Sequence, residues 1–275
     1  MRGSGFDESP EPPFSSGQVI GANPSFADLL RTNRPEAQPH VTAGAAESFS
    51  AQGTTVLGLK FAGGIVMAGD RRATEGYAIA DDKVEKVFQA DDHSTVAIAG
   101  AAGQAVEIVK LLQVELEHYE KVQGDKLSLE GKANRLAQLI RQNFPLALQG
   151  LIVVPLFGGF DLRREEGRLF RYDATGGRWE EEDFMSTGSG GRPAKSSLKK
   201  LWRLGLTREE AVRVAVEALR DAAQEDVATG GPDPTRGIFP IVKITSEEGV
   251  EDVSTDEVRG VYEAMIAGEQ QGSGS

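Results

Sequence analysis

The order of the expected elements predicts an α+β fold in which antiparallel sheets are covered by layers of helices. Strand-like runs come first, and two helices, further strands, two more helices, a hairpin and a final helix follow. Blocks of strands and blocks of helices favour antiparallel sheets, whereas alternating single strands and helices favour βαβ winding. The composition, with 39% hydrophobic and 26% charged residues, is that of an ordinary globular protein long enough to bury a core.

The first expected element is a hairpin. Its strands are two apolar runs, Thr54–Phe61 and Ile65–Ala68, and the turn between them contains two glycines that can take a positive φ. The second run leads into a charged cluster that begins with Asp70. Because Asp70 comes so soon after apolar residues, we expect it to be partly buried, where a carboxylate requires a cationic partner.

Three strands and two helices are expected next. The strands are Tyr77–Ala80, Val84–Phe88 and Thr95–Ala99. The first helix opens at residues 100–103 and continues to about residue 122. Its apolar side chains are spaced by three and four residues, namely Ala105, Ile108, Val109, Leu112, Leu116 and Tyr119. The second helix is expected over Leu129–Leu148, with Gly150 as its stop signal.

The middle of the chain returns to strands. Leu151–Phe157 is apolar but too short for a helix, so it predicts a buried strand. Leu169–Tyr172 and Trp179–Phe184 flank a pair of glycines and predict another hairpin. A short basic helix is expected around Ala194–Leu201.

Two capping boxes predict the last two helices. Thr207 caps a helix that runs to about Glu225, and Ser254 caps one that runs to about Ile266. A strand is expected between them, at Ile238–Thr245. The Gly/Ser-rich end of the chain is expected to lack regular structure.

Residues 1–53 differ in composition from everything that follows. They contain six of the twelve prolines and no lysine. Such a segment buries too little apolar surface to offset its chain entropy. One interpretation is a flexible tail, and the other is a pro-segment that ends at Gly53.

Composition excludes several classes of function. The chain has no cysteine, which removes disulfides, thiolate nucleophiles and cysteine-based zinc sites. Its three histidines leave few places for Ser-His-Asp chemistry. The net charge of −12 argues against a nucleic-acid-binding surface. The sequence has neither an apolar run of about 18 residues nor a signal-peptide pattern, so it predicts a soluble protein of a reducing compartment.

A hydroxyl nucleophile in such a chain needs an unusual proton acceptor. The candidates are Asp, Glu, Lys, Tyr and a chain-terminal amine, whose unperturbed pKa of about 8 lies near working pH. A terminal amine serves only a residue that is itself N-terminal. Thr54 would become that residue after one cleavage at Gly53. The alternative is that Thr54 is an ordinary strand threonine, since β-branched residues are common in strands.

Taken together, several motifs resemble those of the β-subunits of the bacterial, actinobacterial-type proteasome core particle. The motifs are Gly53-Thr54-Thr55-Val56, Ala68-Gly69-Asp70-Arg71-Arg72-Ala73-Thr74, Lys86, Gly100, Gly188-Ser189-Gly190 and Asp226-Val227-Ala228-Thr229-Gly230-Gly231. The resemblance covers residues 54–266. It implies the N-terminal-nucleophile hydrolase fold, a four-layer αββα sandwich. It further implies a pro-segment over residues 1–53 that is removed by self-cleavage, a domain over 54–267 and a disordered tail over 268–275.

The resemblance also implies roles for individual residues. The Thr54 hydroxyl would be the nucleophile and its freed amine the proton acceptor, and the self-cleavage site would be the bond between Gly53 and Thr54. Lys86, held by Asp70, would be a buried cation that lowers the pKa of the nucleophile–amine pair. The N–H of Gly100 would form the oxyanion hole.

Two further residues and a pocket complete the implied site. Ser189 and Asp226 would form hydrogen bonds around the Thr54 amine and orient it. The substrate pocket would be lined by Ala73, Val84, Ile98 and Ala102, while the backbone of Thr74 would pair with an extended peptide. Because these side chains are apolar, we expect cleavage after hydrophobic residues rather than after acidic or basic ones. No metal and no cofactor are expected.

The implied activity is that of a threonine endopeptidase acting on unfolded proteins in the cytoplasm. The resemblance implies homo-heptameric β-rings stacked with α-rings as α7β7β7α7, an ATPase ring that feeds tagged substrates, and no nucleic-acid or membrane partner. Two alternatives are the catalytic subunit of the two-component ATP-dependent bacterial threonine protease and a non-catalytic ring subunit.

Two other signals are weaker. Gly188–Lys195 is glycine-rich before a lysine, but Pro193 stands where a phosphate-binding loop requires its second glycine. His118 has no partner histidine on its expected helix, and we interpret it as a surface or interface residue.

Overall fold

The computed structural model describes residues 53–75 and 78–272. All of them belong to one of the two units of the chain, residues 41–275. The predicted pro-segment therefore lies outside the described residues except for Gly53. Residues 273–275 of the predicted tail also lie outside them.

Within the described residues, two five-stranded antiparallel sheets lie at the centre of the unit. The first has the strand order β10-β1-β2-β11-β12. Its strands are β1 (Thr55–Phe61), β2 (Gly64–Gly69), β10 (Phe184–Gly188), β11 (Ile241–Ser246) and β12 (Gly249–Asp252). The second has the order β5-β6-β7-β8-β9. Its strands are β5 (Val87–Asp91), β6 (Ser94–Gly100), β7 (Val153–Asp161), β8 (Glu166–Tyr172) and β9 (Arg178–Glu181). A small hairpin pairs β3 (Ala73–Glu75) with β4 (Ala78–Asp81).

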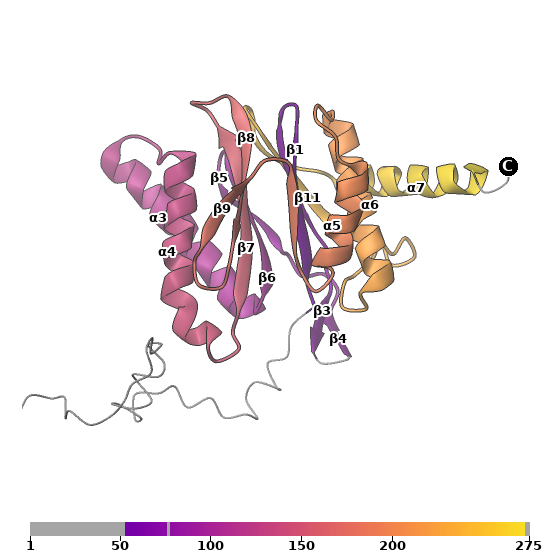
Figure 1. Cartoon of the computed structure of the whole chain (residues 1–275), viewed down its shortest axis with the longest axis horizontal. Helices are drawn as coiled ribbons and strands as arrows, with labels where there is room; N and C mark the ends of the chain where they lie inside the picture. The colour runs from indigo at the N-terminus through magenta and orange to yellow at the C-terminus, as the bar shows by residue number, and fades with distance from the viewer. Residues whose placement is uncertain (1–52, 76–77, 273–275) are drawn as a thin grey trace, which may run out of the picture. The chain divides into compact units, whose positions relative to one another are not determined.

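Helices cover the outer face of each large sheet (Figure 1). Helices α3 (Ala102–Gln123) and α4 (Leu129–Ala147) pack on the second sheet. Helices α5 (Gly191–Leu201) and α6 (Arg208–Glu225) pack on the first, and α7 (Thr255–Gly272) packs against α6. The layers follow the order helix, sheet, sheet, helix, which confirms the predicted α+β sandwich.

The β1–β2 hairpin is apolar almost throughout because both of its faces are buried. Along β1, Leu57 and Leu59 pack toward the helices, whereas Val56 packs toward the second sheet. Along β2, Val66 faces the helices and Met67 faces the other sheet. Side chains alternate between the faces of a strand, so a strand between two apolar layers needs an apolar residue at nearly every position.

Several predicted elements are confirmed. The β1–β2 hairpin forms with Gly64 at a φ of 151°, and β8 and β9 form the second hairpin with Gly176 at a φ of 81°. Thr207 begins α6 with a complete capping box, in which its hydroxyl and the Glu210 carboxylate each accept a backbone N–H. At the start of α7, the Ser254 hydroxyl accepts the N–H of Glu257 at 3.2 Å.

The strand expected at Val84–Phe88 is displaced toward its C-terminal end, since β5 begins only at Val87. Residues 84–86 instead cross from one sheet to the other. The Val84 N–H donates to the Arg71 carbonyl after the end of β2, and the Lys86 carbonyl accepts the Ile98 N–H of β6. A segment whose two ends bond to different parts of the chain in this way does not form a regular strand of either sheet.

The run Trp179–Phe184, expected as one strand, is divided between the two sheets. Strand β9 ends at residue 181, and β10 begins at Phe184 in the other sheet. Asp183 stands at the crossing, where its carbonyl accepts the Lys60 N–H and its carboxylate accepts the Phe184 N–H. The hydrophobic pattern does not reveal which sheet each half joins, because that depends on pairing with distant strands.

The last helix is longer than predicted. It runs to Gly272 rather than to about Ile266, so residues 268–272 of the predicted tail are helical. The Arg220 guanidinium of α6 binds the Glu269 carboxylate through two hydrogen bonds and holds this end of α7 in place. The predicted domain boundary at residue 267 is therefore too early. Among the described residues, no helix has both the length and the apolar character needed to cross a membrane.

Candidate active site

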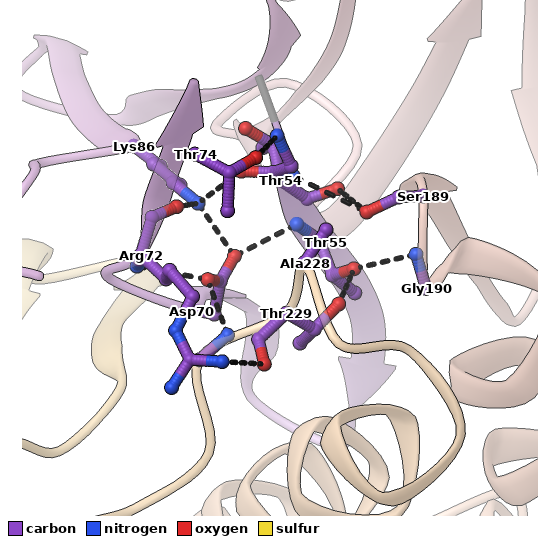
Figure 2. A network of polar contacts seen from close by, with 12 residues as sticks. Thr54, Thr55, Asp70, Arg72, Thr74, Lys86, Ser189, Gly190, Ala228 and Thr229 are labelled. Atoms are coloured by element: carbon purple, nitrogen blue, oxygen red, sulfur yellow. Dashed lines mark hydrogen bonds and ion pairs between the residues drawn. The ribbon is translucent and has the colours of Figure 1, made fainter. Parts of the chain in front are cut away.

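The register of the first sheet brings the predicted catalytic residues to one end of it. Thr54 immediately precedes β1, Asp70 immediately follows β2, and Ser189 immediately follows β10. Antiparallel pairing places the start of β1 beside the ends of both neighbours, and the partners nearest this end are Val56 with Gly69 and Thr55 with Gly188. Two strand ends and one strand start therefore meet at Thr54 (Figure 2).

Thr54 is buried and is still joined to Gly53, so its nitrogen is a peptide amide. That amide donates to the Ser189 hydroxyl at 3.3 Å, and the Ser189 N–H donates to the Thr54 carbonyl at 2.9 Å. The Ser189 hydroxyl thus stands where it would contact the free α-amine of a chain that begins at Thr54. The predicted pairing of these two residues is present in the uncleaved chain.

Asp70 is the most fully bonded group of the site. Its side chain is 0% exposed, and Oδ1 accepts the Lys86 ammonium and the Thr55 N–H, each at 2.7 Å. Oδ2 accepts the N–H groups of Arg72 and Gly230, each at 2.9 Å. A buried carboxylate is stable in its charged form when donors and a cation surround it, as here. The expected burial of Asp70 with a cationic partner is found.

Lys86 stands between Asp70 and the Gly53–Thr54 bond. The Lys86 side chain is 4% exposed, and besides Asp70 it donates to the carbonyl oxygens of Arg72 and, at 3.3 Å, Gly53. Burial lowers the pKa of Lys86 from its ordinary value, and the nearby Asp70 carboxylate opposes this shift without cancelling it. The ammonium is therefore held by three oxygen acceptors yet gives up a proton more readily than an exposed lysine.

Asp226 lies on the loop after α6 and reaches the same centre through hydroxyl groups. Its carboxylate accepts the Thr229 hydroxyl at 2.6 Å and the Ala228 N–H at 3.2 Å. The Ser189 side chain lies close enough to help lower the pKa of Asp226, while the Ser189 hydroxyl donates to the Thr54 carbonyl at 3.4 Å. Burial acts to raise the pKa of Asp226, but these hydrogen bonds and the charge of Lys86 outweigh it and hold the pKa below its usual value. Asp226 is thus a carboxylate beside Ser189, the residue whose hydroxyl accepts the Thr54 amide.

A small cavity of about 40 Å³ opens beside Thr54 and Lys86. Its lining includes all four residues predicted for the pocket wall, namely Ala73, Val84, Ile98 and Ala102. Gly100 lines it as well. The lining also includes residues that the sequence reasoning missed: Glu85, Phe88, Ala105 and Val106. Ala105 and Val106 lie three and four residues after Ala102, so they share its face of a helix and could have been predicted from that spacing. Phe88 lies two residues after Lys86 and could have been predicted from strand spacing.

Gly100 closes β6 with a φ of 122°, and a Cβ there would lie 2.1 Å from the Ile152 carbonyl oxygen. The position therefore requires glycine. Thr74 does not line the cavity, but its hydroxyl accepts the Gly53 N–H at 2.9 Å. This side-chain contact adds to the backbone role predicted for Thr74.

Gly53 is held so closely that no side chain fits. A Cβ at this position would lie 2.2 Å from the Ala228 Cβ and 2.5 Å from the Ala228 carbonyl oxygen. Together with the bonds to Thr74 and Lys86, this contact fixes the peptide that precedes Thr54. The sequence analysis placed the cleavage site at Gly53, but the contact with residue 228 could not be predicted.

The described part of the chain, this centre included, offers no group of three or more His, Asp or Glu side chains placed to hold a metal ion. His118 is exposed on α3, in agreement with its interpretation as a surface residue.

Comparison with known proteins agrees with the site. The family model described as "Proteasome subunit" matches residues 50–233. A protein named "Proteasome subunit beta" from Acidimicrobium ferrooxidans is 55% identical over 238 residues, or 86% of this chain and 87% of the relative. A relative of the same name from Acidothermus cellulolyticus is 52% identical, and the match covers 88% of this chain and 86% of the relative. Another, from Streptomyces griseus, is 53% identical, and the match covers 88% of this chain and 87% of the relative. The family match includes every residue of the site from Gly53 to Thr229, and the relatives cover most of the chain, so the chain belongs to the proteasome subunit family, among its β-subunits.

Proposed function

We propose that this chain is the self-processing catalytic β-subunit of a proteasome core particle, with Thr54 as its nucleophile. The observation that carries the proposal is the placement of Lys86. Its ammonium is bound to the buried Asp70 carboxylate and lies 3.3 Å from the carbonyl oxygen of Gly53, directly before Thr54. A cation in this position favours negative charge on that oxygen and on a neighbouring hydroxyl.

Processing would begin with attack of the Thr54 hydroxyl on the carbonyl carbon of Gly53. The C–N bond to Thr54 breaks as its nitrogen takes up a proton, which leaves an ester between Gly53 and the Thr54 oxygen. Water then hydrolyses this ester and releases the segment that ends at Gly53. Thr74 and Ala228 hold the Gly53 peptide for this step, by a hydrogen bond and by close contact respectively.

The product of processing is an α-amine in the place now occupied by the Thr54 amide. The Ser189 hydroxyl lies 3.3 Å from that nitrogen, and the Asp226 carboxylate lies beside the Ser189 side chain. In peptide hydrolysis the amine would take the proton of the Thr54 hydroxyl as the oxygen attacks a substrate carbonyl. The Gly100 N–H would stabilise the resulting oxyanion, and removal of such a donor typically costs about 10²–10³ in rate.

The cavity beside Thr54 supports a preference for hydrophobic residues at the cleaved position. Apart from Thr54, Glu85 and Lys86, its side chains are apolar, and the Lys86 ammonium is already bound to Asp70. An acidic substrate side chain would lose its hydration there without gaining a free cationic partner. A basic one would meet only the half-exposed Glu85 carboxylate, which already lies 3.8 Å from the Lys243 ammonium. Thr74 would pair through its backbone with an extended substrate chain.

A proteasome β-subunit assembles in rings with α-subunits, and we further propose homo-heptameric β-rings in an α7β7β7α7 particle. Active sites facing a closed chamber would make a protease of broad specificity safe in the cytoplasm. An ATPase ring would deliver unfolded or tagged proteins. The bonding of Thr54, Asp70 and Lys86 favours a catalytic subunit over a purely structural one, and the names of the relatives favour the proteasome over the two-component protease.

The test is the mass of the purified chain after assembly with its α-subunit. We expect the wild type to begin at Thr54, and T54A to keep residues 1–53 and to have no peptidase activity. A covalent inhibitor directed at an N-terminal threonine should label Thr54 in the wild type alone. Processing at Gly53 or peptide turnover by T54A would refute the assignment of the nucleophile.

A further inference from the structure

One buried hydroxyl next to the proposed nucleophile joins three separate segments of the chain. Thr55 lies at the start of β1 with 0% exposure. Its Oγ1 accepts the N–H of Gly190, which precedes α5, at 2.9 Å. The same oxygen lies 2.6 Å from Oγ1 of Thr229, on the loop after α6 (Figure 2). The strand, the turn and the loop are thus tied together at one oxygen atom.

The direction of these hydrogen bonds follows from the number of protons present. A carboxylate only accepts, so the contact of 2.6 Å between Thr229 and Asp226 uses the single hydroxyl proton of Thr229. The Thr55–Thr229 bond must then use the proton of Thr55. The chain therefore runs in one direction, from the Gly190 N–H to Thr55, from Thr55 to Thr229, and from Thr229 to Asp226.

Close packing around Gly190 and Thr229 holds these hydrogen bonds in a single arrangement. A Cβ at Gly190 would lie 2.5 Å from Oγ1 of Thr229 and 2.6 Å from Oγ1 of Thr55, so the turn comes this close only because residue 190 is glycine. Thr229 is also buried, which keeps water from replacing either partner. Each hydroxyl thus has one defined orientation.

We propose that Thr55 is a positioning residue, whose hydroxyl orients the Asp226 carboxylate toward Ser189 and the amine of Thr54. This inference rests on the proposed function, since it assigns Asp226 to the orientation of that amine. Thr55 touches neither substrate nor reacting atoms. It acts through Thr229, and it couples the strand that carries the nucleophile to the loop that carries the carboxylate.

The test compares T55V, which keeps the branched shape but has no hydroxyl, with T55S, which keeps the hydroxyl. Both are made in the full chain, assembled with the α-subunit, and rates are expressed per site titrated with a covalent inhibitor. We expect T55V to lower kcat about tenfold or more with little change in KM, and T55S to remain near the wild type. We also expect the acid limb of the kcat/KM profile of T55V to move to lower pH, because a misaligned carboxylate stabilises the protonated amine less well.

A double-mutant cycle with D226N separates positioning from general damage to the fold. If Thr55 acts through Asp226, T55V should cost little further activity in the D226N background. If turnover is too slow to measure, the same cycle is read from the rate of processing by intact mass. Additive effects in the cycle would overturn the proposal. The proposal would also be overturned if T55V, at each titrated active site, had the kcat and the pH profile of the wild type. This holds even if T55V formed fewer active sites than the wild type.

The T54A variant distinguishes this failure from failure of the proposed function. Activity in T54A would refute the proposed nucleophile whatever Thr55 does. An inactive T54A together with an unaffected T55V would refute only the positioning role of Thr55.

Discussion

The ammonium of Lys86 and Oδ1 of Asp70 lie 2.7 Å apart, and both side chains are almost completely buried. Neither charge is left alone, because Asp70 also accepts backbone N–H groups and Lys86 also donates to two carbonyl oxygens. The pair joins the end of β2 to the segment that enters β5, and therefore links the two sheets at the site. The same contact thus holds two segments of the fold together and fixes the ammonium that we propose to act on Thr54.

We therefore predict that Asp70→Asn both destabilises the fold and stops processing. The substitution leaves the Lys86 ammonium buried beside a neutral amide, and removal of one partner of a buried ion pair costs about 3–5 kcal/mol. Chemical denaturation would measure the free energy of unfolding, and intact mass would measure processing. As a matched control, Glu117→Gln removes the exposed ion pair with Lys121 and should change stability by less than about 1 kcal/mol. Full processing by the Asp70→Asn variant would contradict the role given to the pair.

The contact between Gly53 and Ala228 predicts that Gly53→Ala blocks or greatly slows processing. The new Cβ would overlap Ala228 and push the peptide away from Lys86 and Thr74. Intact mass against time gives the rate. Gly103→Ala is the control, because a Cβ on that helical glycine meets nothing within 4 Å.

The same contact gives a second check. Adding Ala228→Gly to Gly53→Ala removes the nearest clash and should restore processing in part, although the carbonyl of residue 228 remains close. Wild-type processing by Gly53→Ala alone would show that the uncleaved peptide moves freely at this point.

The lowered pKa of Asp226 predicts how this residue contributes to stability as pH changes. Its folded-state pKa is below the unfolded value, so the carboxylate stabilises the fold above the unfolded pKa of about 4, and this contribution is lost as pH falls through the folded pKa. Denaturation of wild type and D226N across the acidic range should give a difference in unfolding free energy that is constant above about pH 5 and shrinks below pH 4. A constant difference throughout would mean that Asp226 titrates alike in both states.

The lining of the cavity predicts substrate preference. Fluorogenic peptides with Leu, Tyr or Phe at the cleaved position should be hydrolysed faster than those with Arg or Glu. Phe88→Ala should widen the cavity and shift kcat/KM toward larger residues, by about tenfold or more between Tyr and Ala substrates. Trp179→Ala, which alters a half-exposed aromatic side chain on β9 rather than the cavity, should leave the ratio unchanged. Faster cleavage after Arg or Glu than after Leu would refute the hydrophobic preference.

Much of the fold could be predicted from local pattern. Apolar runs around glycine pairs predicted the β1–β2 and β8–β9 hairpins, and Thr207 predicted the start of α6. The errors occurred where a segment leaves one sheet for the other, at residues 84–86 and at Asp183, or where a distant ion pair extends a helix, as Arg220 does for α7. The structure at such positions depends on partners far away in the chain. The spacing of apolar residues within a short segment does not identify those partners.

By itself, the sequence determined the chemistry open to this protein. With no cysteine and three histidines, composition left a hydroxyl nucleophile whose proton acceptor could be Asp, Glu, Lys, Tyr or a terminal amine, and the resemblance of its motifs to those of proteasome β-subunits then pointed to Thr54 and its own amine. Only the tertiary structure decided how Thr54 is surrounded. Oγ1 of Thr55 bonds to both Thr229 and Gly190, and Ala228 lies in close contact with Gly53. Strand register and loop packing bring these residues together although they lie about 135 to 175 positions apart in the chain. Hydrogen bonds and close contacts act over a few ångströms of space, so only the folded chain reveals which residues share them.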